Sequence, residues 1–162
     1  MAIYLRPGHS WGKMVGGRMQ RSFPRSRTDL ARSTAAAWAC EMVHRLTPEE
    51  QPSPEKFNLL TEVLAALEEA PYLSGVRLGF ALRFLQLAGF GLENRDPWPA
   101  VQKAHPDWAE ALMRHPLSEL GRDPWKDPAI TALEHLAGGV VNDHLSRPLY
   151  VNRFRQMTGI EI

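Results

Sequence analysis

The chain has 162 residues, 44% of them hydrophobic and 23% charged, and a net charge of +1, the usual mixture of a soluble globular domain. No apolar run approaches the roughly 18 residues of a membrane-spanning helix, and the N-terminus lacks the apolar core of a secretory signal. Cys40 is the only cysteine, which excludes an internal disulfide or a multi-cysteine zinc site and predicts a reducing compartment, the cytoplasm.

Residues 1–25 have a composition unlike the rest of the chain. Ala2–Leu5 is a short β-prone run, turn residues follow it, and residues 11–19 loosely alternate large and small side chains. We predict a hairpin or two edge strands here. Because an isolated hairpin is marginal in water and has open edges, another sheet or a partner should cover it.

From Thr28 the pattern becomes helical. Thr28 is predicted to cap the first helix, with Asp29 favouring its positive end. Its buried face should carry Leu30, Thr34, Ala37, Trp38, Met42 and Leu46. Thr47-Pro48 and Ser53-Pro54 each predict a helix start, because a cap residue precedes proline. The second start opens an apolar stripe of Phe57, Leu60, Val63, Leu64 and Leu67.

The third helix, residues 74–88, is apolar over most of its circumference and is interrupted only by Arg77 and Arg83. We therefore predict that it is the central, most buried helix. Gly89 is well placed as a left-handed C-terminal cap.

Residues 91–127 contain five prolines and are the least regular part, with short helices predicted at Trp98–Ala104 and Pro106–Arg114. Asp127-Pro128 begins the last clear helix, and its paired Gly138-Gly139 predicts close packing or a kink. Its apolar stripe is Ile130, Leu133, Ala137, Val140, Val141 and Leu145. The predicted fold class is mainly α, a compact multi-helix domain preceded by a short β-hairpin.

The sequence offers no catalytic pattern. Gly16-Gly17 lacks the Lys-Ser/Thr of a phosphate-binding loop, the six histidines are scattered, and adjacent glutamates point to different helix faces. Cys40 is expected to be a small core residue. We therefore predict that the protein is not an enzyme and has no cofactor and no metal.

Charge is unevenly distributed along the chain. The first 45 residues carry eight basic and two acidic side chains, whereas residues 46–70 carry six glutamates and one lysine. The glutamates are best explained as a solvated face. The basic third is either a solvated face or a surface for a polyanion, and the pattern leaves both open.

Three stretches, taken in chain order, resemble the RecO family. Residues 21–30, RSFPRSRTDL, resemble the junction where that family leaves its oligonucleotide-binding barrel and enters its first long helix. HRLTPEE, followed by the helix start FNLL, continues the likeness. RFLQLAGFG, residues 83–91, looks like the family's central helix, and HLSRPL, residues 144–149, is similar to its C-terminal helix exit.

The resemblance implies a non-catalytic mediator of DNA repair and recombination, cytoplasmic and nucleoid-associated. Family members bind single- and double-stranded DNA, promote annealing, work with RecR, and contact the acidic C-terminal tail of single-stranded DNA-binding protein to help recombinase loading. Residues 1–25 would be the last strands of the barrel and residues 26–162 the helical domain. The four-cysteine zinc site of many members is absent here. So is most of the barrel, which leaves a fragment and a reduced variant both open.

The expected contacts follow from the charge pattern and the resemblance. The predicted nucleic-acid-binding residues are Arg18, Arg21, Arg25, Arg27, Arg32, Arg147, Arg153 and Arg155. Arg77 and Arg83 are expected to rim the tail pocket or, alternatively, to be ordinary surface arginines. A helical protein–protein interaction domain with no nucleic-acid role is the second hypothesis, and a small-molecule enzyme is the third.

Overall fold

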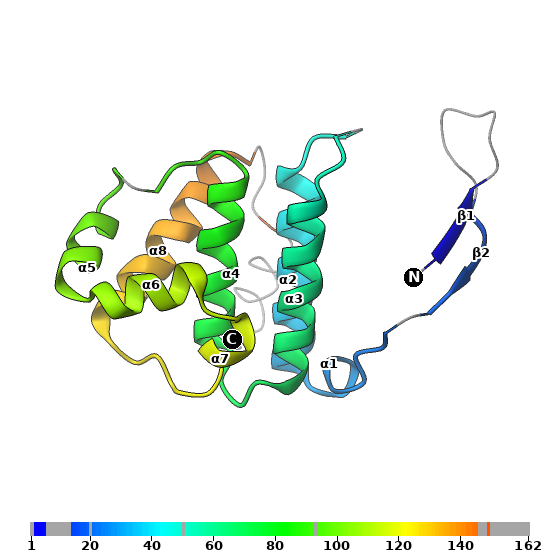
Figure 1. Ribbon diagram of the computed structural model, residues 1–162, viewed down its shortest axis with the longest axis horizontal. Coiled ribbons are helices and arrows are strands. Elements are labelled where there is room, and N and C mark those ends of the chain that lie inside the picture. Colours follow the sequence, from blue (N-terminus) through cyan, green and yellow to red (C-terminus); the bar gives the residue numbers. More distant parts are fainter. Residues whose placement is uncertain are drawn as a thin grey trace.

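The computed structural model describes residues 2–5, 14–19, 21–49, 51–92, 94–145 and 149. Over these residues the protein is mainly α, as the sequence predicts (Figure 1). The elements are β1 (Ala2–Leu5), β2 (Met14–Arg18), α1 (Arg25–Thr28), α2 (Leu30–Leu46), α3 (Pro54–Glu69), α4 (Ser74–Leu87), α5 (Trp98–Ala104), α6 (Pro106–Arg114), α7 (Leu117–Leu120) and α8 (Pro128–Asp143).

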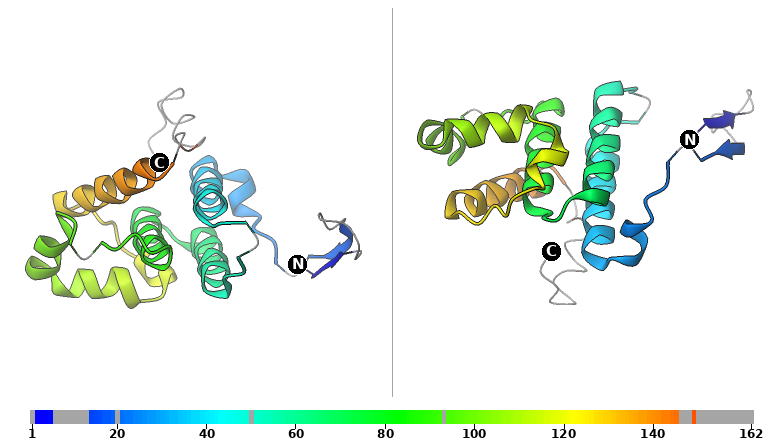
Figure 2. Two further views of the ribbon diagram at one scale, coloured as in Figure 1. Left: turned by 90° about the horizontal axis from the view of Figure 1, so that it is seen from above. Right: turned by 60° about the horizontal axis from the view of Figure 1, so that its bottom comes forward.

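The two strands form the predicted hairpin. β1 pairs antiparallel with β2, with Ala2 opposite Arg18 and Tyr4 opposite Gly16. Both views in Figure 2 show the hairpin lying away from the helices, so within the described residues it has no sheet beside it. The domain boundary predicted after residue 25 falls at the start of α1 and stays a prediction.

Three helices begin at a side-chain cap. Asp29 accepts a hydrogen bond from the backbone N–H of Arg32, Ser53 from that of Lys56, and Asp127 from that of Ala129. The caps predicted at Ser53 and Asp127 are confirmed. The one predicted at Thr28 is wrong, because Thr28 is the last residue of α1 and Asp29 caps α2.

A fourth predicted start does not exist. Thr47 and Pro48 lie between α2 and α3, where no helix begins. Thr47 is instead the C-cap residue of α2, with an extended backbone.

Helix α4 is the centre of the body, as predicted. It packs against α2, α3, α6, α7 and α8, and nine of its residues are buried. Phe80 and Phe84 stack with ring centroids 5.7 Å apart, and Trp38 of α2 meets Phe80 edge-on at 5.9 Å. The helix ends at Gly89, whose φ of 83° is the left-handed conformation predicted for it.

Two of the predicted apolar stripes are confirmed only in part. Leu30 is 53% and Phe57 is 67% exposed, and Ala37 also lies on the surface. Cys40, expected in the core, is exposed as well. Four predicted positions are buried, Thr34 and Met42 in α2 and Val63 and Leu67 in α3, and the buried faces also carry Ala35, Ala39, Leu59 and Ala66, which were not predicted. Each helix has apolar residues on more than one side, so the neighbouring helices decide which side is buried.

The irregular region contains the two predicted short helices, α5 and α6, with the predicted bounds. The sequence reading missed the four-residue α7. Of the two roles predicted for Gly138-Gly139, close packing is not found among the described residues, and a kink stays a prediction. A Cβ at Gly138 or Gly139 would meet no atom of the described residues within 4 Å, whereas one at Gly75 would collide with Trp125 and with the backbone of Leu120.

Candidate nucleic-acid interface

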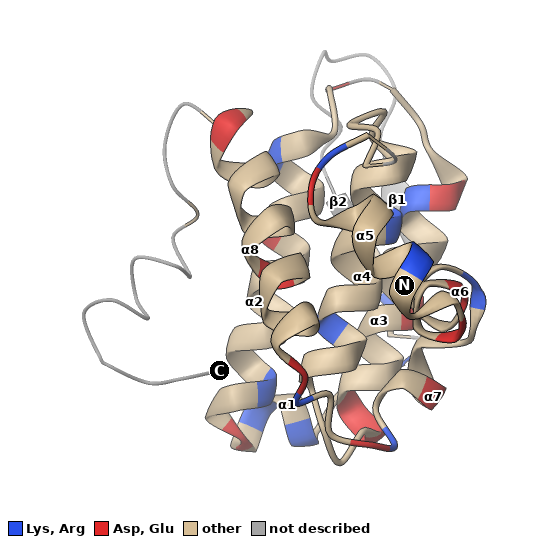
Figure 3. Ribbon diagram, turned by 90° about the vertical axis from the view of Figure 1, so that its left-hand side faces the viewer, with Lys and Arg blue, Asp and Glu red and all other residues tan. Residues whose placement is uncertain are grey.

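The basic residues before the helical body lie at its surface. Arg18 ends β2, Arg21 follows it, and Arg25 and Arg27 belong to α1; all four are exposed. No acidic residue occurs between residues 18 and 28. Figure 3 shows basic positions near α1 with acidic positions close by, and charges of both signs over the rest of the body. This basic segment, residues 18–27, is the part of the described chain best suited to a polyanion.

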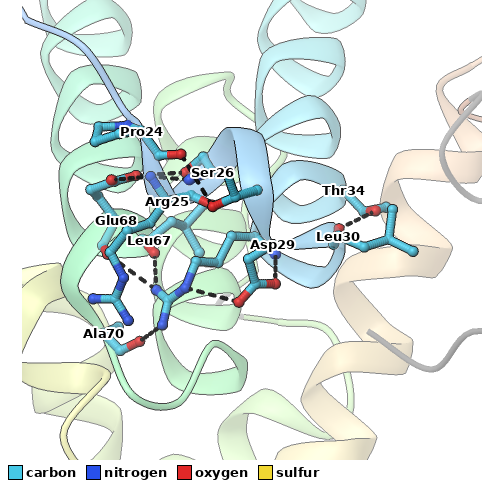
Figure 4. Close-up of polar contacts among 11 residues, drawn as sticks. Pro24, Arg25, Ser26, Asp29, Leu30, Thr34, Leu67, Glu68 and Ala70 are labelled. Carbon is cyan, nitrogen blue, oxygen red and sulfur yellow. Dashed lines mark hydrogen bonds and ion pairs between the residues drawn. The ribbon is translucent and has the colours of Figure 1, made fainter.

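Glu68, from the last turn of α3, holds the start of α1. Its carboxylate accepts hydrogen bonds from the backbone N–H of Arg25 at 2.6 Å, from that of Ser26 at 3.0 Å and from the Ser26 hydroxyl at 2.9 Å (Figure 4). α1 has no side-chain cap of its own, so a distant carboxylate serves as its cap. Glu68 is 7% exposed, which corrects the expectation of a solvated glutamate face at this position.

The pKa of Glu68 reflects two opposing influences. Desolvation by burial raises it, whereas the hydrogen bonds from Arg25 and Ser26, together with the positive charge of Arg25, lower it. The lowering influences are stronger in sum, and the pKa lies below the ordinary value of a glutamate. Glu68 is therefore a carboxylate when it caps α1.

Arg32 makes the converse contact, from the first turn of α2 to the end of α3. It is 6% exposed, and its guanidinium donates to the carbonyl oxygens of Leu67, Glu68 (3.3 Å) and Ala70 (2.7 Å). A cation at the C-terminal end of a helix satisfies carbonyls that lack an intrahelical donor. Arg32 was predicted to bind nucleic acid. Its burial corrects that assignment, because the donors that would hold a phosphate are used inside the fold.

Asp29 completes the corner between α1 and α2. Besides capping α2, it lies 3.3 Å from Nε of Arg32 through Oδ2. The hydrogen bond from the Arg32 backbone is the largest influence on its pKa, which is lowered. We call Arg32 and Glu68 the reciprocal cap, because Glu68 of α3 closes the start of α1, and Arg32, at the start of the next helix α2, closes the end of α3.

Arg77 and Arg83, which were predicted to rim a tail pocket, both make contacts within the fold. Arg83 donates to the carbonyls of Leu112 (2.7 Å), Ala111 (3.1 Å) and His115, and so closes the end of α6. Burial lowers the pKa of Arg83, and the charge of Glu62 partly opposes this. Arg77 lies over the ring of Trp38, 5.3 Å from its centroid.

A pocket of about 450 Å³ does open where the C-terminal part of α4 meets α5 and α6. Leu92, Trp98 and Met113 supply apolar walls. Its polar lining residues are Gln86, Gln102, Glu110 and Arg114. Neither Arg77 nor Arg83 lines it. The sequence reading missed this pocket, because its walls come from three helices that share no common motif.

The remaining predicted contacts, Arg147, Arg153 and Arg155, lie outside the described residues. Within the described ranges no three histidine, cysteine, aspartate or glutamate side chains gather to hold a metal ion. Nor does any helix there have the length and apolar character needed to cross a membrane.

Comparison with known proteins identifies the helical region. Residues 27–96 match the family model described as "Recombination protein O C terminal". The DNA repair protein RecO of Pelobacter propionicus is 38% identical over 68 residues, which are 42% of this chain and 28% of that protein. The RecO protein of Geobacter metallireducens is 35% identical over 88 residues, 54% of this chain and 35% of that protein.

The RecO protein of Anaeromyxobacter dehalogenans is 38% identical over 69 residues, 43% of this chain and 27% of that protein. The chain thus spans about a third of the length of the curated relatives it matches. No solved structure matches it significantly. The family match runs across α2, α3 and α4, so the part of the chain that forms these three helices is similar to the C-terminal region of RecO DNA repair proteins.

Proposed function

We propose that the chain is a non-catalytic mediator of DNA repair and recombination, which binds single- and double-stranded DNA through the basic segment. The observation that carries the proposal is the exposure of Arg18, Arg21, Arg25 and Arg27 within ten residues that contain no acid. Two carboxylates at this end of the fold, Asp29 and Glu68, are engaged by backbone N–H groups. They leave the arginine side chains available to phosphates.

Such a surface binds phosphates by charge. Arginines that contact phosphates release counterions, so affinity falls steeply with salt and depends little on sequence. In this proposal the chain acts in the cytoplasm at the nucleoid. With RecR and single-stranded DNA-binding protein, it would help recombinase loading and strand annealing, as the RecO resemblance implies.

The test is DNA binding by the double variant Arg25→Glu/Arg27→Glu, measured by fluorescence anisotropy over a salt series. We expect the Kd for a single-stranded oligonucleotide to rise at least tenfold, and the salt dependence to flatten by about 0.7 per lost phosphate contact. Lys103→Glu/Arg114→Glu is the matched control, because it changes the charge equally at exposed positions of α5 and α6. Equal affinities of the two double variants would contradict the proposal.

The pocket supports a second binding activity within the same function. An acidic tail that ends in an apolar side chain and a carboxylate needs an apolar cavity with a cation beside it. Trp98 and Leu92 supply the first, and Arg114 supplies the second. We propose that this pocket, and not the surroundings of Arg77 and Arg83, takes the tail of single-stranded DNA-binding protein.

A fluorescent acidic peptide with an apolar C-terminal residue tests the pocket. Arg114→Glu should abolish its binding, because a second carboxylate would then face the peptide's own, whereas Arg25→Glu/Arg27→Glu should leave it intact. Retained peptide binding in Arg114→Glu would exclude this pocket. Tight binding of a protein partner, together with weak and salt-independent DNA binding, would favour the alternative of a helical protein–protein interaction domain.

A further inference from the structure

The reciprocal cap also fixes the conformation of the short helix α1, which the stability of the helical body alone does not require. α1 has only four residues, far fewer than a helix needs to persist by itself in water. Glu68 reaches it from 42 to 43 positions away in the chain and satisfies the two N–H groups at its start. The conformation of the segment that carries Arg25 and Arg27 is therefore set by a residue of α3.

We propose that Glu68 and Arg32 are positioning residues for DNA binding, an inference that rests on the proposed function of the basic segment. Glu68 fixes the beginning of α1, and Arg32 fixes the end of α3 from which Glu68 projects. Together they hold Arg25 and Arg27 on the outer side of a fixed helical turn. Phosphates then meet a preorganised pair of cations.

Preorganisation affects affinity because binding otherwise has to order the segment. A flexible basic segment loses conformational entropy when it contacts DNA, whereas a segment that is already fixed does not. Loss of the cap should therefore weaken DNA binding, even though every arginine of the basic segment is still present.

Electrostatics alone predicts the opposite effect of losing Glu68, a gain in DNA affinity. The inference can therefore be tested by measuring whether the affinity falls or rises. Removing the negative charge of Glu68 raises the positive potential around the basic segment, and on that ground alone DNA should bind more tightly. Glu69, the next residue, is exposed, and none of the hydrogen bonds to α1 ends on it. Glu69→Gln therefore removes the same charge in the same region without touching the cap.

The experiment compares Glu68→Gln with Glu69→Gln by anisotropy with a single-stranded oligonucleotide over a salt series. The Gln amide keeps the side-chain length, but its NH2 end cannot accept a hydrogen bond, so a backbone N–H at the start of α1 loses its acceptor. We expect the Kd of Glu68→Gln to rise about three- to tenfold with a flatter salt dependence. Glu69→Gln should bind as tightly as the unmodified chain or more tightly.

A double-mutant cycle separates positioning from general destabilisation. In an Arg25→Gln/Arg27→Gln background, Glu68→Gln should change the Kd by less than twofold, because the arginines that it positions are gone. Ser26→Ala, which removes only the hydroxyl bond to Glu68, should give a smaller loss of the same kind and serves if Glu68→Gln does not fold.

Two results would overturn the inference: wild-type affinity in the folded Glu68→Gln and Ser26→Ala variants, or an undiminished loss in the Arg25→Gln/Arg27→Gln background. If Arg25→Gln/Arg27→Gln itself bound DNA normally, the proposed function would fail, a result distinct from either of these.

Discussion

Arg32 and Glu68 are both buried charges, and each is compensated mainly by backbone groups of another helix, the end of α3 for Arg32 and the start of α1 for Glu68. Glu68 accepts two backbone N–H groups and one hydroxyl, and Arg32 donates to three backbone carbonyls. A buried charge is tolerated only when its hydrogen bonds are made. Removal of Glu68 therefore leaves orphaned N–H groups at the start of α1, and removal of Arg32 leaves orphaned carbonyl groups at the end of α3. Both residues therefore stabilise the fold through their hydrogen bonds to backbone groups, and not only through their charge.

The lowered pKa of Glu68 predicts how stability changes with pH. A carboxyl whose folded pKa is lowered stabilises the fold fully above its ordinary value of 4.5, and this stabilisation is lost as the pH falls through the lowered value. Urea unfolding between about pH 5 and pH 3 should therefore show a smaller loss of stability in Glu68→Gln than in the unmodified chain.

Glu69→Gln, which removes the same charge from an exposed neighbour, controls for net charge in this titration. If Glu68→Gln lost stability as steeply as the unmodified chain, Glu68 would not be the carboxylate whose protonation matters. The hydrogen bonds to α1 would then contribute little to the fold.

At the scale of elements, glycine has opposite roles in α4 and α8. Gly75 lies where α4 approaches the backbone of Leu120 and the indole of Trp125, and that indole in turn donates to the Leu120 carbonyl. Gly139 is exposed, and a Cβ added at this position would meet no atom of the described residues within 4 Å. The first glycine permits close packing of helix against loop, and the second only weakens its helix.

A glycine-to-alanine substitution should therefore change the free energy of unfolding in opposite directions in the two helices. Gly75→Ala should destabilise by about 1–3 kcal/mol, because backbone must move to make room. Gly139→Ala should stabilise by about 0.5–1 kcal/mol, because alanine is the better helix former. The urea midpoints of both variants give the measurement, and a stable Gly75→Ala protein would show that the α4 contact is looser than its geometry indicates.

The helices themselves could largely be predicted from local signals. Ser53-Pro54, Asp127-Pro128 and Gly89 mark helix ends through their own backbone chemistry, and each does so in the fold. The exposed sides of Leu30 and Phe57 could not be predicted in this way. A helix with apolar residues around much of its circumference buries whichever side its neighbours cover, and only the packed body specifies those neighbours.

At the scale of the whole molecule, the family match contains the reciprocal cap but only a small part of the pocket. The match covers residues 27–96, so it contains both residues of the reciprocal cap, while the basic segment leads into its beginning. Most of the pocket lies beyond its end, on α5 and α6. The proposed DNA contacts therefore adjoin the part shared with RecO proteins, and the proposed tail pocket belongs mainly to the part outside the match.

By itself, the sequence determined the mainly α class, most helix ends, the central position of α4, and the basic character of residues 18–27. These properties depend on local backbone chemistry, on composition and on the order of charges along the chain. Only the tertiary structure decided that Arg32 is buried, that Glu68 caps α1, and that Arg83 closes α6. Each of these contacts joins residues 28 or more positions apart, and no local pattern specifies which backbone groups a folded chain will bring to a given side chain.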